Sequence, residues 1–136
     1  MKKTSILAAA LLVFSAANAQ SIVLPANPTE SERTAAEELA LHLEKAVGKP
    51  VPVIREGTRG TAPFLYVGAT DFARKQGIRS GQFEPEEWLL QACGKEALIL
   101  AGGEPRGVLY ASWEFLERFF NILWPDEETV YIPENQ

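Results

Sequence analysis

The segment ALILAGGEPRGVLYASWEFLERFF, residues 97–120, constrains the fold more than any other part of this chain. An apolar run typical of a strand meets a turn rich in glycine, and an apolar sequence with helical periodicity follows. The helix is predicted over about 106–120. Phosphate-binding loops are built in the same order, with a strand, a glycine turn and then a helix. The spacing within the turn therefore decides between a binding loop and a purely structural turn.

The turn matches neither of the common phosphate-binding patterns. Gly102 and Gly107 have the spacing of a Walker loop, but Val108 and Leu109 stand where that loop needs Lys and then Ser or Thr. A dinucleotide-binding loop needs G-x-G-x-x-G within a parallel strand–helix–strand unit, whereas a hairpin strand precedes this turn. We therefore interpret the segment as a structural turn that joins a strand to a helix. Its residues are Gly102, Gly103, Arg106 and Gly107.

Arg106 is expected to form a salt bridge at the start of the last helix. A cation is unfavourable at the positive N-terminal end of a helix unless an acidic group balances it. We therefore expect the guanidinium to bond to an acidic side chain or to backbone carbonyl groups in a partly buried pair, and not to a ligand.

The remaining sequence predicts an α+β domain. After the first strand, Thr29 and Glu32 form a capping box at the start of a long helix, which Gly48 ends. A short helix is expected within 68–77, and Pro52 either places its strand at an edge of the sheet or cuts that strand short. The last two strands form a hairpin, so we expect a mixed sheet with helices packed on it. The strands are predicted at 21–25, 51–54, 64–67, 88–92 and 97–101.

Residues 1–19 are predicted to be a secretory signal peptide. Two lysines precede an apolar stretch over 6–14, and Ala17-Asn18-Ala19 is a small-x-small cleavage site. The apolar stretch is too short to span a bilayer. Because Gln20 follows the cleavage site, there is no lipoprotein cysteine. We expect residues 20–136 to form one domain of a periplasmic or secreted protein.

The composition excludes several partners and sites. The chain has 13 Lys and Arg against 18 Asp and Glu, and an acidic balance disfavours nucleic acid and anionic membranes as partners. A single histidine, His42, and a single cysteine, Cys93, predict no metal site, no intramolecular disulfide and no nucleophilic triad. The acidic pairs at 86–87 and 127–128 lie in polar loops, where adjacent side chains diverge, so solvated charge explains them better than a glycosidase pair does. No catalytic, cofactor-binding or metal-binding residue is predicted.

The last helix carries a wide apolar arc, roughly 160° of its circumference. The residues on this arc are Val108, Leu109, Ser112, Trp113, Phe115, Leu116, Phe119 and Phe120. One interpretation is that a small domain needs all of these side chains in its core. The other is that part of the arc is a second contact surface, to which Leu41 adds. The interface residues of this second interpretation are Tyr110, Trp113 and Trp124.

Four segments between residues 22 and 133 carry a resemblance to a known family. They are IVLPANPTESERTAAEELALHLEKAVGKPVPVI, FLYVGAT, ALILAGGEPRGVLYASWEFLER and LWPDEETVYIP. In their order and spacing they resemble the small N-terminal domain that precedes the catalytic barrel of family 67 α-glucuronidases and of related large bacterial glycosidase-like proteins. The resemblance implies a fold similar to the non-catalytic second domain of β-hexosaminidases, in which the Arg-Gly turn is scaffold. The catalytic carboxylates of that family lie in the barrel, so none is assigned to this sequence.

Two functions from different classes are therefore expected. The first is a non-catalytic accessory domain of a secreted, α-glucuronidase-like glycoside hydrolase that takes part in xylan breakdown, with the catalytic barrel as its partner. The alternative is a free-standing periplasmic module that binds a carbohydrate or a partner protein. An autonomous enzyme is the least favoured interpretation, and no cofactor is expected.

Overall fold

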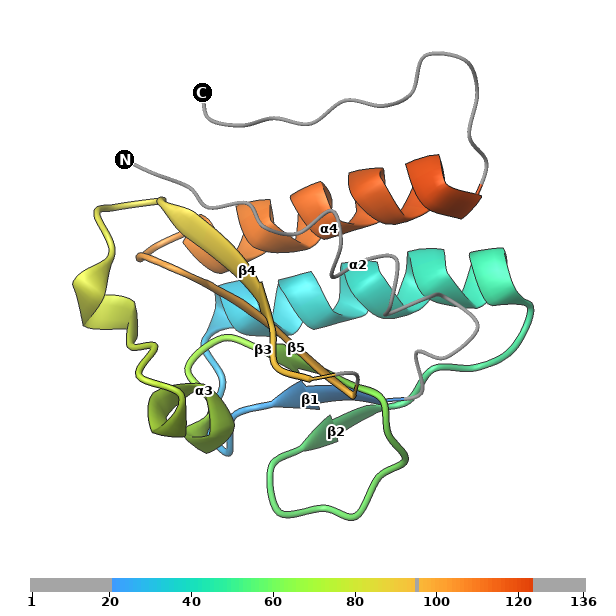
Figure 1. The fold of residues 1–136 in the computed structure, drawn as a ribbon, viewed down its shortest axis with the longest axis horizontal. Helices are drawn as coiled ribbons and strands as arrows, with labels where there is room; N and C mark the ends of the chain where they lie inside the picture. The colour runs from blue at the N-terminus through green and yellow to red at the C-terminus, as the bar shows by residue number, and fades with distance from the viewer. Residues whose placement is uncertain (1–20, 95, 124–136) are drawn as a thin grey trace.

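The computed structural model describes residues 21–94 and 96–123, which form one mixed sheet with helices on both of its faces (Figure 1). The strands are β1 (Ser21–Leu24), β2 (Val53–Arg55), β3 (Phe64–Val67), β4 (Trp88–Ala92) and β5 (Ala97–Gly102). The helices are α2 (Glu30–Val47), α3 (Asp71–Lys75) and α4 (Gly107–Leu123), with a short 3-10 helix η2 (Ser80–Gln82) ahead of β4.

The strands lie in the order β2-β1-β3-β5-β4, and β4 is the antiparallel member. β1 runs parallel to β2 and β3, and β3 runs parallel to β5. The predicted α+β class and the predicted β4–β5 hairpin are both confirmed, with Leu90 opposite Leu100 in the hairpin. β2 lies at an edge of the sheet, as Pro52 predicts, although it begins at Val53 and not at Val51.

Helix α2 begins and ends at the residues that the sequence indicates. The Thr29 side chain accepts a hydrogen bond from the Glu32 N–H at 3.1 Å, and the Glu32 carboxylate accepts one from the Thr29 N–H at 2.8 Å. Gly48 follows the last turn with a φ of +77°, and its N–H donates to the Glu44 carbonyl at 2.9 Å. The left-handed conformation at this position favours glycine, which has no Cβ to clash.

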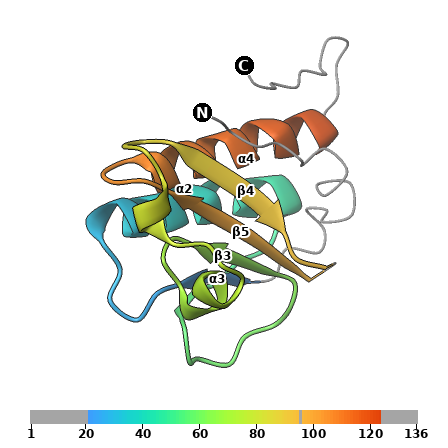
Figure 2. The same cartoon turned by 60° about the vertical axis from the view of Figure 1, so that its left-hand side comes forward.

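The main core lies between the sheet and the pair α2 and α4, which lie side by side on one face (Figure 1). Its largest fully buried side chains are Phe115, Ile22, Leu39, Leu43, Leu65, Leu90, Leu98 and Leu100. A smaller cluster lies on the opposite face, where α3 packs on the sheet (Figure 2). There Ala73 and Ile78 cover Ile99 and Ala101. The domain therefore has one thick apolar layer and one thin one, and the thin layer leaves more of the sheet open.

Candidate functional site

The β5–α4 turn needs glycine because three backbone segments meet there. The Gly103 N–H donates to the Glu87 carbonyl at 2.9 Å, which holds the turn against the segment ahead of β4. A Cβ atom on Gly103 would overlap the Glu84 carbonyl oxygen, and one on Gly107 would overlap the Glu87 carbonyl oxygen. A Cβ atom on Gly102 would lie 2.6 Å from the Cα atom of Gly107. Close backbone approach is a common use of glycine, and it explains this turn without a ligand.

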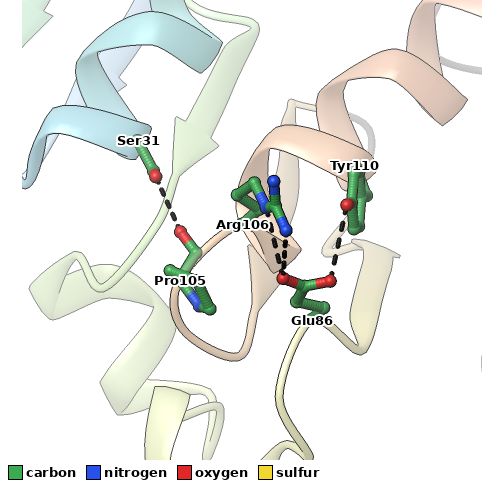
Figure 3. A network of polar contacts seen from close by, with 5 residues as sticks. All are labelled: Ser31, Glu86, Pro105, Arg106 and Tyr110. Carbon is green, nitrogen blue, oxygen red and sulfur yellow. Dashed lines mark hydrogen bonds and ion pairs between the residues drawn. The ribbon is translucent and has the colours of Figure 1, made fainter.

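Arg106 precedes α4 and bonds to Glu86, which lies just ahead of β4 (Figure 3). Its Nη2 and Nε atoms donate to one carboxylate oxygen of Glu86 at 2.8 and 3.2 Å. The other carboxylate oxygen accepts from the Tyr110 hydroxyl at 3.4 Å. This network fastens the start of α4 to the loop that leads into β4.

The ion pair between Arg106 and Glu86 is more exposed than the sequence analysis expects. The Arg106 side chain is 55% exposed and the Glu86 side chain 32%. Both groups lie on the outer side of the connections to β4 and α4, beyond the edge of the core. Solvent screens such a pair, so its contribution to stability is small.

A second contact joins the same turn to α2. The Ser31 hydroxyl donates to the Pro105 carbonyl at 2.6 Å, from the first turn of α2 (Figure 3). A cavity of about 20 Å³ lies between these two segments, with Gly103 and Ala69 in its wall. That volume holds about one water molecule and no phosphate group. Two of the N–H groups at the start of α2, those of Thr29 and Glu32, are already bonded within the capping box.

The structure places Tyr110 and Trp113 together on α4. Their ring centroids lie 5.6 Å apart at 47°. Trp113 is 49% exposed, whereas Val108, Phe115 and Leu116 of the same arc are buried in the core. Trp124 lies outside the described residues. The arc therefore has a core-facing part and the exposed Trp113. Trp113 and the half-buried Tyr110, which lies outside the arc, form what we call the α4 surface.

The amino-acid sequence of this domain matches a known family. The glycosyl hydrolase family 67 N-terminus matches residues 7–115, well over half of the chain. The chain belongs to this family. A comparison with curated proteins gives no match. The assignment makes the chain an N-terminal accessory domain of a glycoside hydrolase, associated with a catalytic domain.

In this family 67 N-terminal domain, Arg118 is a buried cation that the sequence analysis does not identify. Arg118 on α4 is only 7% exposed, and its Nε atom donates to the Glu114 carboxylate at 3.1 Å. Its Nη2 atom is buried, and no hydrogen-bond partner is found for it within the described ranges. The i,i+4 spacing predicts the pair, but solvated helix surfaces carry the same spacing, so the burial could not be foreseen.

His42 and Cys93, the other residues considered for a chemical role, lie in different parts of the fold. His42 Nε2 lies 3.4 Å from Glu38 Oε1 on α2. Cys93 is half-buried beyond the end of β4, and burial raises the pKa of its thiol, while a hydrogen bond with Gln91 lowers that pKa by less. In the part of the chain that the structure describes, no group of three or more His, Cys, Asp or Glu side chains could hold a metal ion.

The two acidic residues at 86–87 have different structural roles. Glu86 pairs with Arg106, whereas the Glu87 carboxylate accepts from the Glu84 N–H at 2.8 Å. The pair at 127–128 lies outside the described residues. Over residues 21–94 and 96–123, no helix is long and apolar enough to cross a membrane.

Proposed function

We propose that this accessory domain belongs to a secreted, α-glucuronidase-like enzyme of xylan breakdown, and that its α4 surface packs on the catalytic barrel. The predicted signal peptide supports secretion, and the family supports a barrel as partner. The observation that carries the interface is the exposure of Trp113, at 49%, on a helix whose Val108, Phe115 and Leu116 side chains are buried.

Trp113 has the properties of an interface anchor. Large aromatic side chains give the most contact area for the least loss of conformational freedom, and they dominate many interfaces. The neighbouring Tyr110 ring limits the positions that the indole can take, and Tyr110 is itself held through its hydroxyl by Glu86. A side chain that is already positioned in the free domain loses less entropy on binding.

The domain's contribution is structural. The Glu87 carboxylate beside the β5–α4 turn accepts from a backbone N–H and the Glu86 carboxylate pairs with Arg106, so both hold the turn and neither is placed as one of an acid–base pair across a cleft. Docking of this domain would instead cover an apolar area of the barrel and stabilise it by mass action.

The test is to purify this chain and a family 67 catalytic barrel as separate polypeptides. We expect the chain alone to release no product from glucuronoxylan oligomers or aryl glycosides. Added in excess, it should raise the melting temperature of the barrel and prolong its activity during heating. Turnover by the chain alone that disappears when one carboxylate is replaced would overturn the proposal, as would a barrel whose melting temperature does not change.

The genomic sequence downstream separates this proposal from the free-standing module. A reading frame that continues into a barrel supports the accessory domain. An isolated gene supports a periplasmic module that binds carbohydrate or protein by itself.

A further inference from the structure

α3 packs on the face of the sheet opposite α2 and α4 (Figure 2). A groove of about 290 Å³ lies beside it. One side is the loop after β2, with Glu56 and Thr58, and the other side is α3, with Phe72 and Lys75. Tyr66 of β3 lines the groove between them. The volume is at the lower end of the range for ligand sites, about 300 Å³, so the groove suits a small ring and not a long folded ligand.

Aromatic rings form the apolar part of this groove. Tyr66 and Phe72 stack with centroids 4.3 Å apart and planes 15° apart. Phe64 lies two residues before Tyr66 on β3, and the centroids of these two rings are 5.7 Å apart. Tyr66 and Phe72 are half-buried, so part of each ring remains open to the groove. Partly covered aromatic rings with polar neighbours are typical of sites that bind ligands with one apolar and one polar side.

The polar part offers both donors and acceptors with nearly balanced charge. The Glu56 carboxylate lines the groove, and one of its oxygens accepts from the Asp71 N–H at the start of α3. Burial raises the pKa of the Tyr66 hydroxyl, and the negative charge of Glu56 raises that pKa further. Asp71 is paired with Arg74, whereas no ion pair of Lys75 is found among the residues that the structure describes. Lys75 and Thr58 can therefore donate to a ligand while Glu56 accepts from it.

This combination disfavours several ligand classes. With Asp71 paired to Arg74, Glu56 and Lys75 leave the lining without the net positive charge that would attract phosphate or nucleic acid. A purely apolar ligand would leave the Lys75 and Glu56 charges unpaired. Hydroxyl groups, in contrast, both donate and accept, and a sugar ring has C–H groups that can cover an aromatic face.

We propose that this groove binds one or two neutral sugar rings of a polysaccharide chain. The ring lies against Tyr66 and Phe72, and its hydroxyl groups bond to Glu56, Thr58 and Lys75. This inference draws on the proposed role in polysaccharide breakdown, but it uses the face opposite to the α4 surface. The domain would thereby hold substrate near a barrel that is docked on the other side.

The test is calorimetric and NMR titration of the purified protein with xylohexaose and, separately, with cellohexaose. We expect weak binding with a Kd in the millimolar range, and the largest shifts at the amides of Gly57, Thr58 and Phe72. Lys75→Ala should weaken binding at least fivefold. The control is Lys45→Ala, because Lys45 is also an exposed lysine but lies on α2, on the other face of the sheet. This variant should bind as the unaltered chain does.

Absence of binding to both oligosaccharides, or equal binding by Lys75→Ala, would overturn the proposal. A lack of oligosaccharide binding would leave the proposed function intact, because docking on the barrel depends on Trp113, which lies on the other side of the sheet. Failure of docking, conversely, leaves oligosaccharide binding by the isolated chain unchanged.

Discussion

One carboxylate oxygen of Glu32 accepts a hydrogen bond of 2.9 Å from the N–H of Ala69, while the other caps α2 through the N–H of Thr29. Glu32 is 7% exposed, so one buried side chain joins the start of α2 to the turn after β3. Gly68 lies directly beneath it, and a Cβ atom there would overlap the carboxylate. The position of α2 on the sheet therefore depends on a glycine and a glutamate that are far apart in sequence.

Replacing Gly68 should destabilise the domain more than replacing Gly77. Both glycines have a φ of +86°, but a methyl group on Gly77 meets no atom of the described residues within 4 Å. The left-handed conformation alone costs a non-glycine residue about 1–2 kcal/mol, and we expect Gly77→Ala to lose that much. Gly68→Ala should lose about 1–3 kcal/mol more, because it must also displace the Glu32 carboxylate. Urea unfolding of the two variants measures the difference, and equal losses would show that Glu32 is not held against Gly68.

Removing Glu114 should destabilise the domain more than replacing Arg118 by an apolar residue. Glu114→Ala leaves the buried guanidinium of Arg118 without its partner, and breaking a buried pair in this way costs about 3–5 kcal/mol. Arg118→Met fills much of the same volume without a charge, and such replacements are often neutral or stabilising. Thermal melts of both variants test this order. An Arg118→Met variant that is the less stable of the two would mean that the pair stabilises the fold.

Arg106→Ala should lower the melting temperature only slightly, because the pair with Glu86 is exposed and screened. The difference in melting temperature between the variant and the unaltered protein should be smaller in high salt, because salt weakens the ion pair in the unaltered protein. Melting curves at low and high ionic strength check both statements. Arg106→Lys is the control, since it keeps the charge but loses the two-atom contact. A large loss of stability that is insensitive to salt would contradict this account of Arg106.

Cys93 should react slowly with iodoacetamide at pH 8. Burial raises the pKa of its thiol, so a smaller fraction is thiolate than in a free cysteine, and the thiolate is the reactive form. The rate should increase as the pH rises and should increase sharply in denaturant. Alkylation followed by mass spectrometry gives the rate. A reaction in the folded state as fast as that of the unfolded chain would show that the thiol is neither buried nor perturbed.

Local signals predict much of this fold. The capping box at Thr29 and Glu32, the helix end at Gly48 and the β4–β5 hairpin each depend on residues close in sequence, and all three are confirmed. The glycine-rich turn could be separated from a phosphate loop because a binding loop needs particular residue types at fixed spacing.

Contacts between distant segments could not be predicted in the same way. The second bond of Glu32, to Ala69, spans 37 positions, and no local pattern indicates it. The burial of Arg118 depends on what packs against α4, and the sequence shows only an ordinary i,i+4 pair. The groove beside α3 combines residues from the loop after β2, from β3 and from α3, and it exists only once these elements are assembled.

The central claim is that the α4 surface docks on a catalytic barrel. Sedimentation velocity of this chain mixed with a family 67 barrel tests it most directly, with Trp113→Glu and Val53→Glu as a matched pair. Both positions are exposed and apolar, at 49% and 39%, but Val53 lies on the edge strand β2. We predict that the unaltered chain and Val53→Glu sediment with the barrel, whereas Trp113→Glu keeps its melting temperature and binds at least tenfold more weakly. A Trp113→Glu variant that binds as well as the unaltered chain, or one that unfolds because the indole is core, would contradict the claim.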